Sequence, residues 1–296
     1  MKLEIEGLCK TYANGVKALD DVTMTIPQGM FGLLGPNGAG KSTLMRTLAT
    51  LQEADQGSVR LFCDDTGAPI DVLSEHHEVR KRLGYLPQEF GVYPKTSATR
   101  MLDHIAMLKG VTRSKERREL VDAMLNRVNL YSHRRKAIAN FSGGMKQRFG
   151  IAQALICNPK LLIVDEPTAG LDPGERNRFY NLLAEIGENV IVILSTHIVQ
   201  DVKELCPKMA IIHMGQLLYS GSTIDAVETL NGKVWSRSLT KQELPQYQEN
   251  FDVISTKMVA GNPLVHVVSG EHPGAGFDPV DPDLEDVFFS TIQQVA

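Results

Sequence analysis

The feature that most constrains this chain of 296 residues is a glycine-rich stretch that follows the pattern G-x-x-x-x-G-K-[ST] of a phosphate-binding P-loop. The stretch consists of Gly35, Pro36, Asn37, Gly38, Ala39, Gly40, Lys41, Ser42 and Thr43. The apolar run at 31–34 predicts a buried strand before the loop, and the run at 41–51, which contains no proline or glycine, predicts a helix after it. A chance glycine-rich turn is the alternative, but it would leave this flanking pattern unexplained.

The residue types of the loop suit a bound triphosphate. Gly38 and Gly40 can adopt backbone angles that a side chain disfavours, and they leave room for phosphate oxygens. A helix that begins near Lys41 offers unpaired N–H groups and about half a positive charge at its N-terminus. Lys41 can reach the β and γ phosphates, while the Ser42 hydroxyl can ligate Mg²⁺. The loop therefore predicts nucleotide binding.

Composition narrows the class of protein. Proteins that bind nucleic acids usually carry a basic stripe, whereas this chain has a net charge of −4 and a pI of about 6.1. We therefore expect no nucleic-acid partner. No apolar run approaches the ~20 residues of a membrane span, and the first residues lack a signal-peptide pattern. The four cysteines are far apart, which favours reduced thiols. We therefore expect a cytoplasmic chain. Its short basic clusters at 113–118 and 133–136 favour solvated helix faces, with a surface near anionic lipid headgroups as the alternative.

The hydrophobic pattern predicts an α/β fold in several parts. Alternating residues at 3–6 and 22–26 predict an N-terminal antiparallel β subdomain. Continuous apolar runs at 161–164 and 190–194 predict buried parallel strands of a P-loop NTPase core. Helical stripes between 97 and 130 predict an α-helical subdomain inserted into this core. The last part of the chain alternates short strands, a helix at 240–249, a Pro/Gly-rich linker at 272–282 and a final amphipathic helix.

Charged and polar side chains follow the two predicted buried strands. Asp165 and Glu166 end one strand, and His197 comes directly after the other. Ligands of α/β proteins bind at the carboxyl ends of such strands. Successive side chains of a strand point to opposite faces, so the chain must turn for both carboxylates to face one site, and Pro167 is consistent with that turn. Asp165 suits a Mg²⁺ ligand and Glu166 a water-orienting group, whereas a helix cap and a structural histidine are the simpler alternatives.

Two further positions carry a functional and a structural interpretation each. Tyr12, in a loop between the first two predicted strands, can stack on adenine or can be an ordinary surface tyrosine. Ser142 predicts the N-cap of a helix whose first turn contains Gly143 and Gly144. Glycine in a helix costs roughly 1 kcal/mol relative to alanine, so either something approaches this backbone closely or the helix start is loosely built.

The order of these motifs resembles that of the ATP-binding cassette (ABC) family over residues 1 to about 220. The stretches that match the family's motifs are GPNGAGKST at 35–43 for Walker A, Gln88 for the Q-loop, FSGGMKQR at 141–148 for the signature, LLIVDE at 161–166 for Walker B, Leu171-Asp172 for the D-loop and His197 for the H-loop. Tyr12 falls where the family keeps its adenine-stacking aromatic residue. The usual LSGGQ signature is altered, since Phe141 replaces leucine and Met145 replaces glutamine.

The resemblance implies a role for each matching residue. Lys41 binds phosphate; Ser42, Gln88 and Asp165 hold Mg²⁺ and its waters; Glu166 polarises the attacking water; and His197 contacts the γ-phosphate. In this family two cassettes pair head to tail, so Ser142, Gly143 and Gly144 of one copy close over the nucleotide held by the other. Asp172 then couples the two sites across the interface. Because Met145 cannot complete a capping box with Ser142, the signature helix start is expected to be less rigid before pairing.

The implied function is the ATPase subunit of a bacterial ABC transporter, with an ATPase domain at 1–220, a helical subdomain inserted at about 90–158 and an accessory extension at 221–296. The LEDVF segment near the end resembles exporter ATPases whose membrane subunits are separate chains. We therefore expect a second cassette, the same or different, and membrane partners that place the chain on the cytoplasmic face of the membrane. A soluble ABC-type ATPase of translation or DNA maintenance is the alternative.

Overall fold

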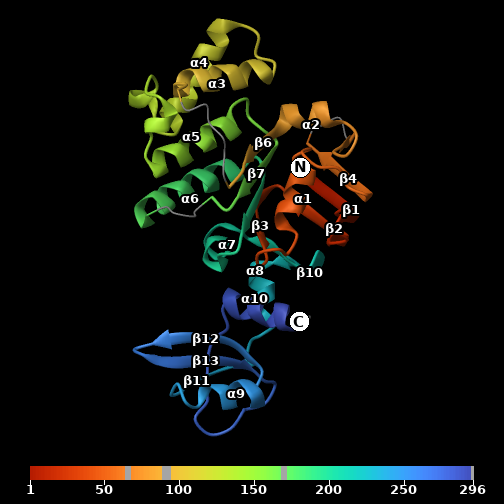
Figure 1. Ribbon diagram of the computed structural model, residues 1–296, viewed down its shortest axis with the longest axis vertical. Helices are drawn as coiled ribbons and strands as arrows, with labels where there is room; N and C mark the ends of the chain where they lie inside the picture. Colours follow the sequence, from red (N-terminus) through yellow and green to blue (C-terminus); the bar gives the residue numbers. More distant parts are fainter. Residues whose placement is uncertain (64–67, 89–94, 168–171, 295–296) are drawn as a thin grey trace.

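The computed structural model describes residues 1–63, 68–88, 95–167 and 172–294, and its central element is a six-stranded, mostly parallel sheet. The strand order is β10-β9-β3-β8-β7-β6. Every pair is parallel except β9 with β10, which are antiparallel neighbours at one edge. The strands are β3 (Gly29–Leu34), β6 (Leu83–Leu86), β7 (Leu161–Asp165), β8 (Ile191–Thr196), β9 (Lys208–His213) and β10 (Gln216–Ser222). Because β3, β8 and β7 are parallel neighbours, their carboxyl ends lie side by side, and we call this part of the sheet its carboxyl edge (Figure 1).

A second sheet covers one side of the central sheet and is antiparallel, with the order β2-β1-β4-β5. Its strands are β1 (Lys2–Thr11), β2 (Lys17–Pro27), β4 (Gln56–Phe62) and β5 (Ile70–Asp71). The buried positions of β2 alternate with exposed ones, as the sequence pattern predicted. Apolar side chains of this sheet, of α1 and of one face of the central sheet share a core, represented by Leu3, Ile26, Phe31, Leu44 and Ile193.

Helices lie on both sides of the central sheet: α1 and α2 pack on the side of the antiparallel sheet, and the others cover the opposite face and extend beyond it. Those of the first 220 residues are α1 (Lys41–Leu48), α2 (His76–Arg82), α3 (Ala98–Leu108), α4 (Ser114–Arg127), α5 (Gly143–Leu155), α6 (Pro173–Gly187) and α7 (Val199–Leu205), with short 3₁₀ turns at Tyr131–His133 and Ile138–Asn140. The pair α3 and α4 packs on α5 at the end of the molecule farthest from the C-terminus (Figure 1). The core beneath these helices is continuous from Leu102 and Phe149 to Leu194.

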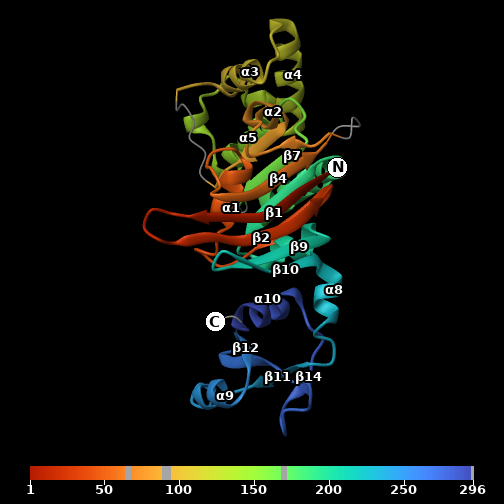
Figure 2. The same cartoon turned by 90° about the vertical axis from the view of Figure 1, so that its right-hand side faces the viewer.

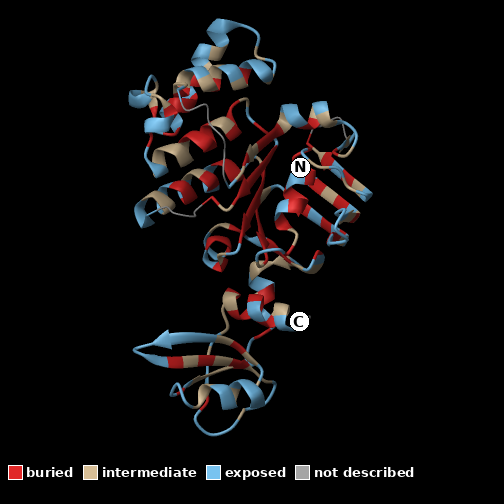
Figure 3. Cartoon of the chain, viewed as in Figure 1, coloured by how far each residue is buried: buried red, intermediate tan, exposed pale blue. Residues whose placement is uncertain are grey.

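The last part of the chain forms a small α+β unit with a four-stranded antiparallel sheet of order β12-β13-β11-β14. Its elements are α8 (Thr223–Glu228), β11 (Val234–Ser238), α9 (Leu244–Asn250), β12 (Val253–Val259), β13 (Asn262–Val268), β14 (Asp278–Pro279) and α10 (Leu284–Gln293). Figure 2 shows this sheet set apart from the central sheet, with α8 and α10 between them. Figure 3 shows that burial is dense in the central sheet and sparse in the outer strands of the extension.

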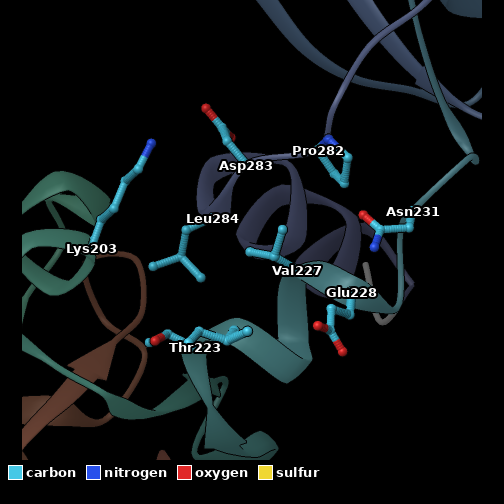
Figure 4. A pocket seen from close by; sticks show the side chains of 9 residues that line it. Lys203, Thr223, Val227, Glu228, Asn231, Pro282, Asp283 and Leu284 are labelled. Carbon is cyan, nitrogen blue, oxygen red and sulfur yellow. The ribbon is translucent and has the colours of Figure 1, made fainter.

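Helix α10 joins the extension to the rest of the chain, because it packs on α7, α8 and β12. A cavity of about 350 Å³ lies at this junction, between Lys203 of α7, Val227 of α8 and Leu284 at the start of α10 (Figure 4). Leu284 and Val287 are buried there and belong to the same core as the central sheet. The extension is therefore attached through an apolar contact and not through its covalent linker alone.

The predicted fold class is confirmed, with differences at the ends of elements. The helix expected at 41–51 ends at Leu48, where the Ala49 N–H donates to the Met45 carbonyl, the Thr50 N–H donates to the Thr47 carbonyl, and Thr50 takes a φ of 59°. The helix expected at 240–249 is shorter and begins at Leu244, with Pro245 in its first turn. Part of the predicted linker at 272–282 pairs with β11 as β14. The proposed division at residue 220 and the subdomain limits of 90–158 stay predictions.

Within the described part of the chain, no helix is both long enough and apolar enough to cross a bilayer.

Candidate functional site

A cleft of about 960 Å³ opens where the P-loop meets the carboxyl edge of the central sheet. Gly38 and Gly40 have φ of 79° and 109°, in the left-handed region, and Gly40 is the N-cap of α1. A Cβ on Gly40 would lie 2.4 Å from the Ala18 carbonyl oxygen, so this glycine is also required by the close approach of β2. The loop thus presents its backbone and the start of α1 toward the cleft, which is the arrangement that binds phosphate.

Lys41 is 6% exposed, and its ammonium group is held by the loop itself. Nζ donates to the Gly35 carbonyl at 2.6 Å and to the Pro36 carbonyl at 3.0 Å. Burial lowers the pKa of the Lys41 ammonium, against the opposing charges of Glu166 and Asp165. Because the cation is poorly solvated and is bound only by neutral carbonyls, an anionic phosphate is a favourable additional partner.

Asp165 and Glu166 end β7 with different surroundings. Asp165 is 8% exposed and lies opposite Ser195 in the β7–β8 register. Burial raises the pKa of the Asp165 carboxyl above its ordinary value. Glu166 has a φ of 44°, and its N–H donates to the Ser195 carbonyl at 2.9 Å. This left-handed residue turns the chain, so the turn that the sequence assigned to Pro167 already occurs at Glu166.

The Glu166 carboxylate is held by two of the predicted site residues. Gln88 Nε2 donates to Oε2 at 3.1 Å, and His197 Nδ1 lies 2.9 Å from Oε1. The three side chains come from the ends of β6, β7 and β8, which the parallel sheet places side by side. A carboxylate with both oxygens fixed can hold a water molecule in a defined direction, as a general base or a water-orienting group must.

Tyr12 also lines the cleft. It follows β1, and its hydroxyl is 3.1 Å from Thr43 Oγ1 and donates to Gln52 Oε1 at 3.0 Å. The side chain is still 36% exposed. The ring is thus anchored through its hydroxyl beside the last residue of the P-loop, while part of the side chain stays accessible.

The signature segment forms the N-terminus of α5, as predicted. Ser142 is the N-cap, and its hydroxyl accepts from the Met145 N–H at 3.3 Å. The two glycines differ in their surroundings. A Cβ on Gly144 would lie 3.0 Å from the Glu175 carboxyl group, whereas a Cβ on Gly143 would meet nothing within 4 Å. The contact with Glu175 therefore explains why a glycine stands at 144. No contact within the described chain requires a glycine at 143, where the backbone is open to a partner.

The cleft gathers many, but not all, of the predicted residues. Those that line it are Tyr12, Asn37, Gly38, Ala39, Gly40, Lys41, Ser42, Thr43, Gln88, Glu166 and His197. The predicted residues that are not among its lining residues in the described chain are Gly35, Pro36, Asp165, Ser142, Gly143, Gly144 and Asp172. Asp172 serves instead as the N-cap of α6. Val16, Lys17, Ala18 and Met214 also line the cleft and were not predicted, because only the packing of β2 and the β9–β10 turn on the P-loop brings them there.

The donor set suits Mg²⁺. Ser42 and Gln88 line the cleft, and Asp165 is buried at the end of β7; their side chains carry oxygen atoms of the kind this cation prefers. Within the described residues no group of three or more His, Cys, Asp or Glu side chains is placed to hold a metal ion. A site with one carboxylate is what a magnesium ion requires when substrate phosphates and water complete its shell.

Two sequence predictions concern residues outside the described ranges. They are Leu171 of the D-loop pair and the first residues of the helical subdomain expected at about 90–158, of which 90–94 are not described.

Comparison with known proteins agrees with this geometry. A family model described as "ABC transporter" matches residues 19–169. The uncharacterized ABC transporter ATP-binding protein YxlF of Bacillus subtilis (strain 168) is 33% identical over 88% of this chain and 84% of its own length. The daunorubicin/doxorubicin resistance ATP-binding protein DrrA of Streptomyces peucetius is 35% identical over 78% of this chain and 68% of its own. The methionine import ATP-binding protein MetN of Histophilus somni (strain 129Pt) is 34% identical over 84% and 74% respectively.

Solved structures give the same result for the fold. A structure titled as the ATP-binding subunit of an ABC transporter is 28% identical, with a TM-score of 0.68 over 77% of this chain and 93% of that one. The dimeric structure of MJ0796, a bacterial ABC transporter cassette, is 24% identical, with a TM-score of 0.66 over 74% of this chain and 98% of that one. The part of the chain that these structures leave uncovered is comparable in size to the extension.

Proposed function

Because this chain belongs to the ABC transporter family as an ATP-binding subunit and an ATPase, we propose that it hydrolyses MgATP at composite sites between two paired cassettes and powers export through separate membrane subunits. Binding of ATP with Mg²⁺, pairing of cassettes and partnership with membrane proteins are general to the family. The direction of transport, the residue roles and the identity of the second cassette are the parts proposed here.

The observation that carries the residue roles is the fixed carboxylate of Glu166. Gln88 and His197 each bind one of its oxygens at the carboxyl edge of the sheet, in the cleft that contains the P-loop. With the triphosphate on the N-terminus of α1, the γ-phosphate lies toward this edge. Glu166 then orients the attacking water and accepts its proton, while His197 contacts the γ-phosphate.

The remaining roles follow from position in the cleft. Lys41 binds the β and γ phosphates, and the Tyr12 ring stacks on adenine. Ser42, Gln88 and Asp165 would hold Mg²⁺, which supplies positive charge against the phosphate oxygens. Burial raises the pKa of the Asp165 carboxyl because it disfavours the charged form. A cation bound beside Asp165 would stabilise the charged form again, so the site favours a cation.

The partner cassette completes the site in this proposal. Ser142 and Gly143 lie outside the cleft of their own chain, and Gly143 has open space where a side chain would be. The start of α5 therefore offers free backbone N–H groups to a phosphate held by another copy. Asp172, the N-cap of α6, faces the same interface in this arrangement. A homodimer is the simplest assembly, and a related second chain would supply the same groups.

Export is proposed from the relatives and from the extension. Relatives with resistance in their names, including DrrA, match most of this chain, but importers such as MetN match to a similar extent. The LEDVF segment that begins α10 is the feature that favours the exporter type. The chain would then lie on the cytoplasmic face of the membrane, bound to subunits that span it.

Glu166→Gln is the variant that tests the site. It keeps the size of the side chain and removes the charge, so ATP should still bind while turnover falls to almost nothing. We expect ATP to convert this variant to a stable dimer in light scattering, and Lys41→Ala in the same background to abolish the dimer. Turnover near that of the parent chain would remove Glu166 from its proposed role.

Transport is tested separately, by affinity purification from detergent-solubilised membranes. Recovery of a multi-span membrane protein without its own P-loop supports the transporter assignment. Stable association with ribosomes or DNA instead would overturn it. With the purified complex in inside-out vesicles, ATPase stimulation by compounds added outside, on the cytoplasmic side, supports export over import.

A further inference from the structure

A fully buried acid lies four residues after His197, outside the lining of the nucleotide cleft. Asp201 of α7 is 0% exposed, and it is not a lining residue of the nucleotide cleft. Its two carboxylate oxygens accept from two different elements: the Tyr180 hydroxyl of α6 donates to Oδ1, and the Thr196 hydroxyl of β8 donates to Oδ2 at 3.1 Å. Burying a carboxylate is costly unless such donors satisfy it, so a role for this cluster is to be expected.

The cluster reaches His197 through Thr196. The Thr196 hydroxyl donates to Asp201 and at the same time accepts from the Ile198 N–H at 2.9 Å. These hydrogen bonds involve the residues immediately before and after His197, so they fix the turn that carries the imidazole. Thr196 itself is 1% exposed.

His197 needs this support because its own side chain is weakly packed. The side chain is 47% exposed, and its one hydrogen bond within the described residues is to Glu166. Because the ring is so exposed, its direction depends on the backbone turn as well as on the bond to Glu166. The chain of contacts therefore runs from Tyr180 through Asp201 and Thr196 to the turn at His197.

The other end of the cluster is equally well buried. Tyr180 is 6% exposed, and burial together with its hydrogen bond to Asp201 raises the pKa of the tyrosine hydroxyl well above its usual range. The hydroxyl therefore stays protonated at neutral pH and keeps donating to Asp201. Through this bond, α6 holds Asp201 in place, and Asp201 in turn holds the His197 turn.

We infer that Asp201, bridged to Tyr180 and Thr196, is a positioning residue that holds the His197 turn in the orientation required for ATP hydrolysis. The inference rests on the role proposed for His197. It adds a residue that never touches the nucleotide, and it predicts an effect on kcat in preference to the KM for ATP, because the turn matters at the reacting phosphate and not in binding of the base or the P-loop phosphates.

Thr196 is the position at which to test this, because it allows two closely matched variants. Thr196→Val keeps the branched shape and removes the hydroxyl, whereas Thr196→Ser keeps the hydroxyl. Loss of a net hydrogen bond worth about 1 kcal/mol corresponds to a several-fold effect, so we expect Thr196→Val to lower kcat about fivefold to tenfold with KM changed less than about twofold. Thr196→Ser should retain most of kcat.

The decisive comparison repeats both variants in a His197→Ala background. If the cluster acts through His197, Thr196→Val adds less than about a twofold further loss there, because coupled residues are non-additive. An equal loss in both backgrounds would overturn the inference and leave Thr196 with a structural role only. A second measurement does not depend on activity: the imidazole NMR resonances of His197, without nucleotide, should shift in Thr196→Val and remain in place in Thr196→Ser.

These outcomes separate the inference from the proposed function. If His197→Ala alone leaves turnover unchanged, the role proposed for His197 is wrong, and the resonances still report whether the cluster orients the ring. If His197→Ala lowers turnover but Thr196→Val leaves both kcat and the resonances unchanged, the proposed function stands and the positioning role of Asp201 is wrong.

Discussion

At Glu166 the site depends on a backbone conformation that side chains disfavour. The residue follows the buried strand β7 directly and has a φ of 44°. A left-handed conformation costs a residue with a Cβ roughly 1 kcal/mol, and it persists where the surroundings determine it. Here the N–H bond to Ser195 and the bonds from Gln88 and His197 provide that constraint. Stability and site geometry therefore oppose each other at this position.

A pair of variants isolates this strain. Glu166→Gly and Glu166→Ala both lack the carboxylate, so both should lose almost all ATP turnover. Only alanine keeps the Cβ, so we expect the free energy of unfolding of the glycine variant to exceed that of the alanine variant by about 1 kcal/mol. Chemical denaturation of the two proteins measures the difference. Glycine and alanine variants of equal stability would show that the left-handed backbone is not strained.

Individual site residues could be predicted from the sequence where a motif requires a particular residue type at a particular position. The P-loop, the paired carboxylates and His197 could be identified because their spacing places them at strand ends, and the structure brings most of them into one cleft. The left-handed backbone at Glu166 could not be identified, since glutamate has no preference for it. Met214 and Val16 were missed because no local pattern indicates that their turns pack on the P-loop.

Among the secondary-structure elements, α10 has the most complete cap. Asp283 accepts from the backbone N–H groups of Glu285 and Asp286, and Asp286 accepts in return from the Asp283 N–H, which makes a capping box. Asp286 is 1% exposed and lies 2.7 Å from His266 Nδ1 of β13. The first turn of α10 therefore ties the helix to the extension's own sheet, while its apolar face packs on α7 and α8.

We expect Asp286→Ala to destabilise the extension by about 2 kcal/mol, because it removes one side of the capping box and leaves a half-buried histidine without its acceptor. Trp235 in β11 is the one tryptophan of the chain, so its fluorescence during urea unfolding reports on this part of the molecule. Glu285→Ala is the control, since Glu285 is 37% exposed and pairs with Lys257 at the surface. Equal loss from both variants would contradict the role of the buried cap.

The same residue predicts a pH dependence. Burial alone would raise the pKa of Asp286, but hydrogen bonds from His266 and the Asp283 N–H outweigh it and bring the pKa below the ordinary 3.8. An acid with a lowered pKa stabilises the fold above its ordinary pKa, and that contribution is lost as pH falls through the lower value. We expect the urea midpoint of Trp235 fluorescence to fall more steeply below pH 3.8 in the parent chain than in Asp286→Asn. Parallel curves would rule out this contribution.

Elements that carry their own local signals were predicted well. Ser142 was identified as an N-cap from its sequence context, and the structure confirms the bond to Met145 N–H. Strand β14 was missed and its residues were predicted to be part of a linker. Asp278 and Pro279 form a strand only because they pair with β11, which is far away in the sequence. Local propensity does not report such pairing, so short strands in a Pro/Gly-rich stretch can be found only once their partner is placed.

At the scale of the whole molecule, the proposal depends on surfaces that a single chain leaves open. Gly143 has no atom within 4 Å of the place where a Cβ would be, although it begins α5. Within one chain, alanine would be tolerated there and would favour the helix by roughly 0.5–1 kcal/mol. In a pair of cassettes, the same methyl group would lie between the start of α5 and the partner's phosphate.

Gly143→Ala should therefore leave the free energy of unfolding unchanged or slightly raised while it lowers ATP-driven dimerisation and turnover at least tenfold. Light scattering with ATP, in the Glu166→Gln background, measures the dimer. Gly270→Ala, at another open glycine with ordinary backbone angles, controls for the entropic effect of the added methyl group and should dimerise normally. Normal pairing of Gly143→Ala would exclude α5 from the composite site.

The arrangement of the whole chain was partly foreseeable. The order of the motifs predicted which strands meet at the catalytic edge, because parallel connections leave few alternatives. The packing of α10 on α7 was not foreseeable, because it joins segments about 80 residues apart through apolar side chains that would suit any core. Docking of the extension is long-range information that composition and periodicity do not contain.

Strand β12 is the outermost strand of the extension's sheet and pairs with β13 alone among the described strands. At its end Met258 and Val259 are 57% and 53% exposed. An unpaired strand edge with exposed apolar side chains can pair with a strand of another molecule. The charge of the neighbouring Lys257 opposes such pairing. Concentrated solutions at high salt, where this charge is screened, are thus the conditions in which the chain is most prone to precipitate through its tail.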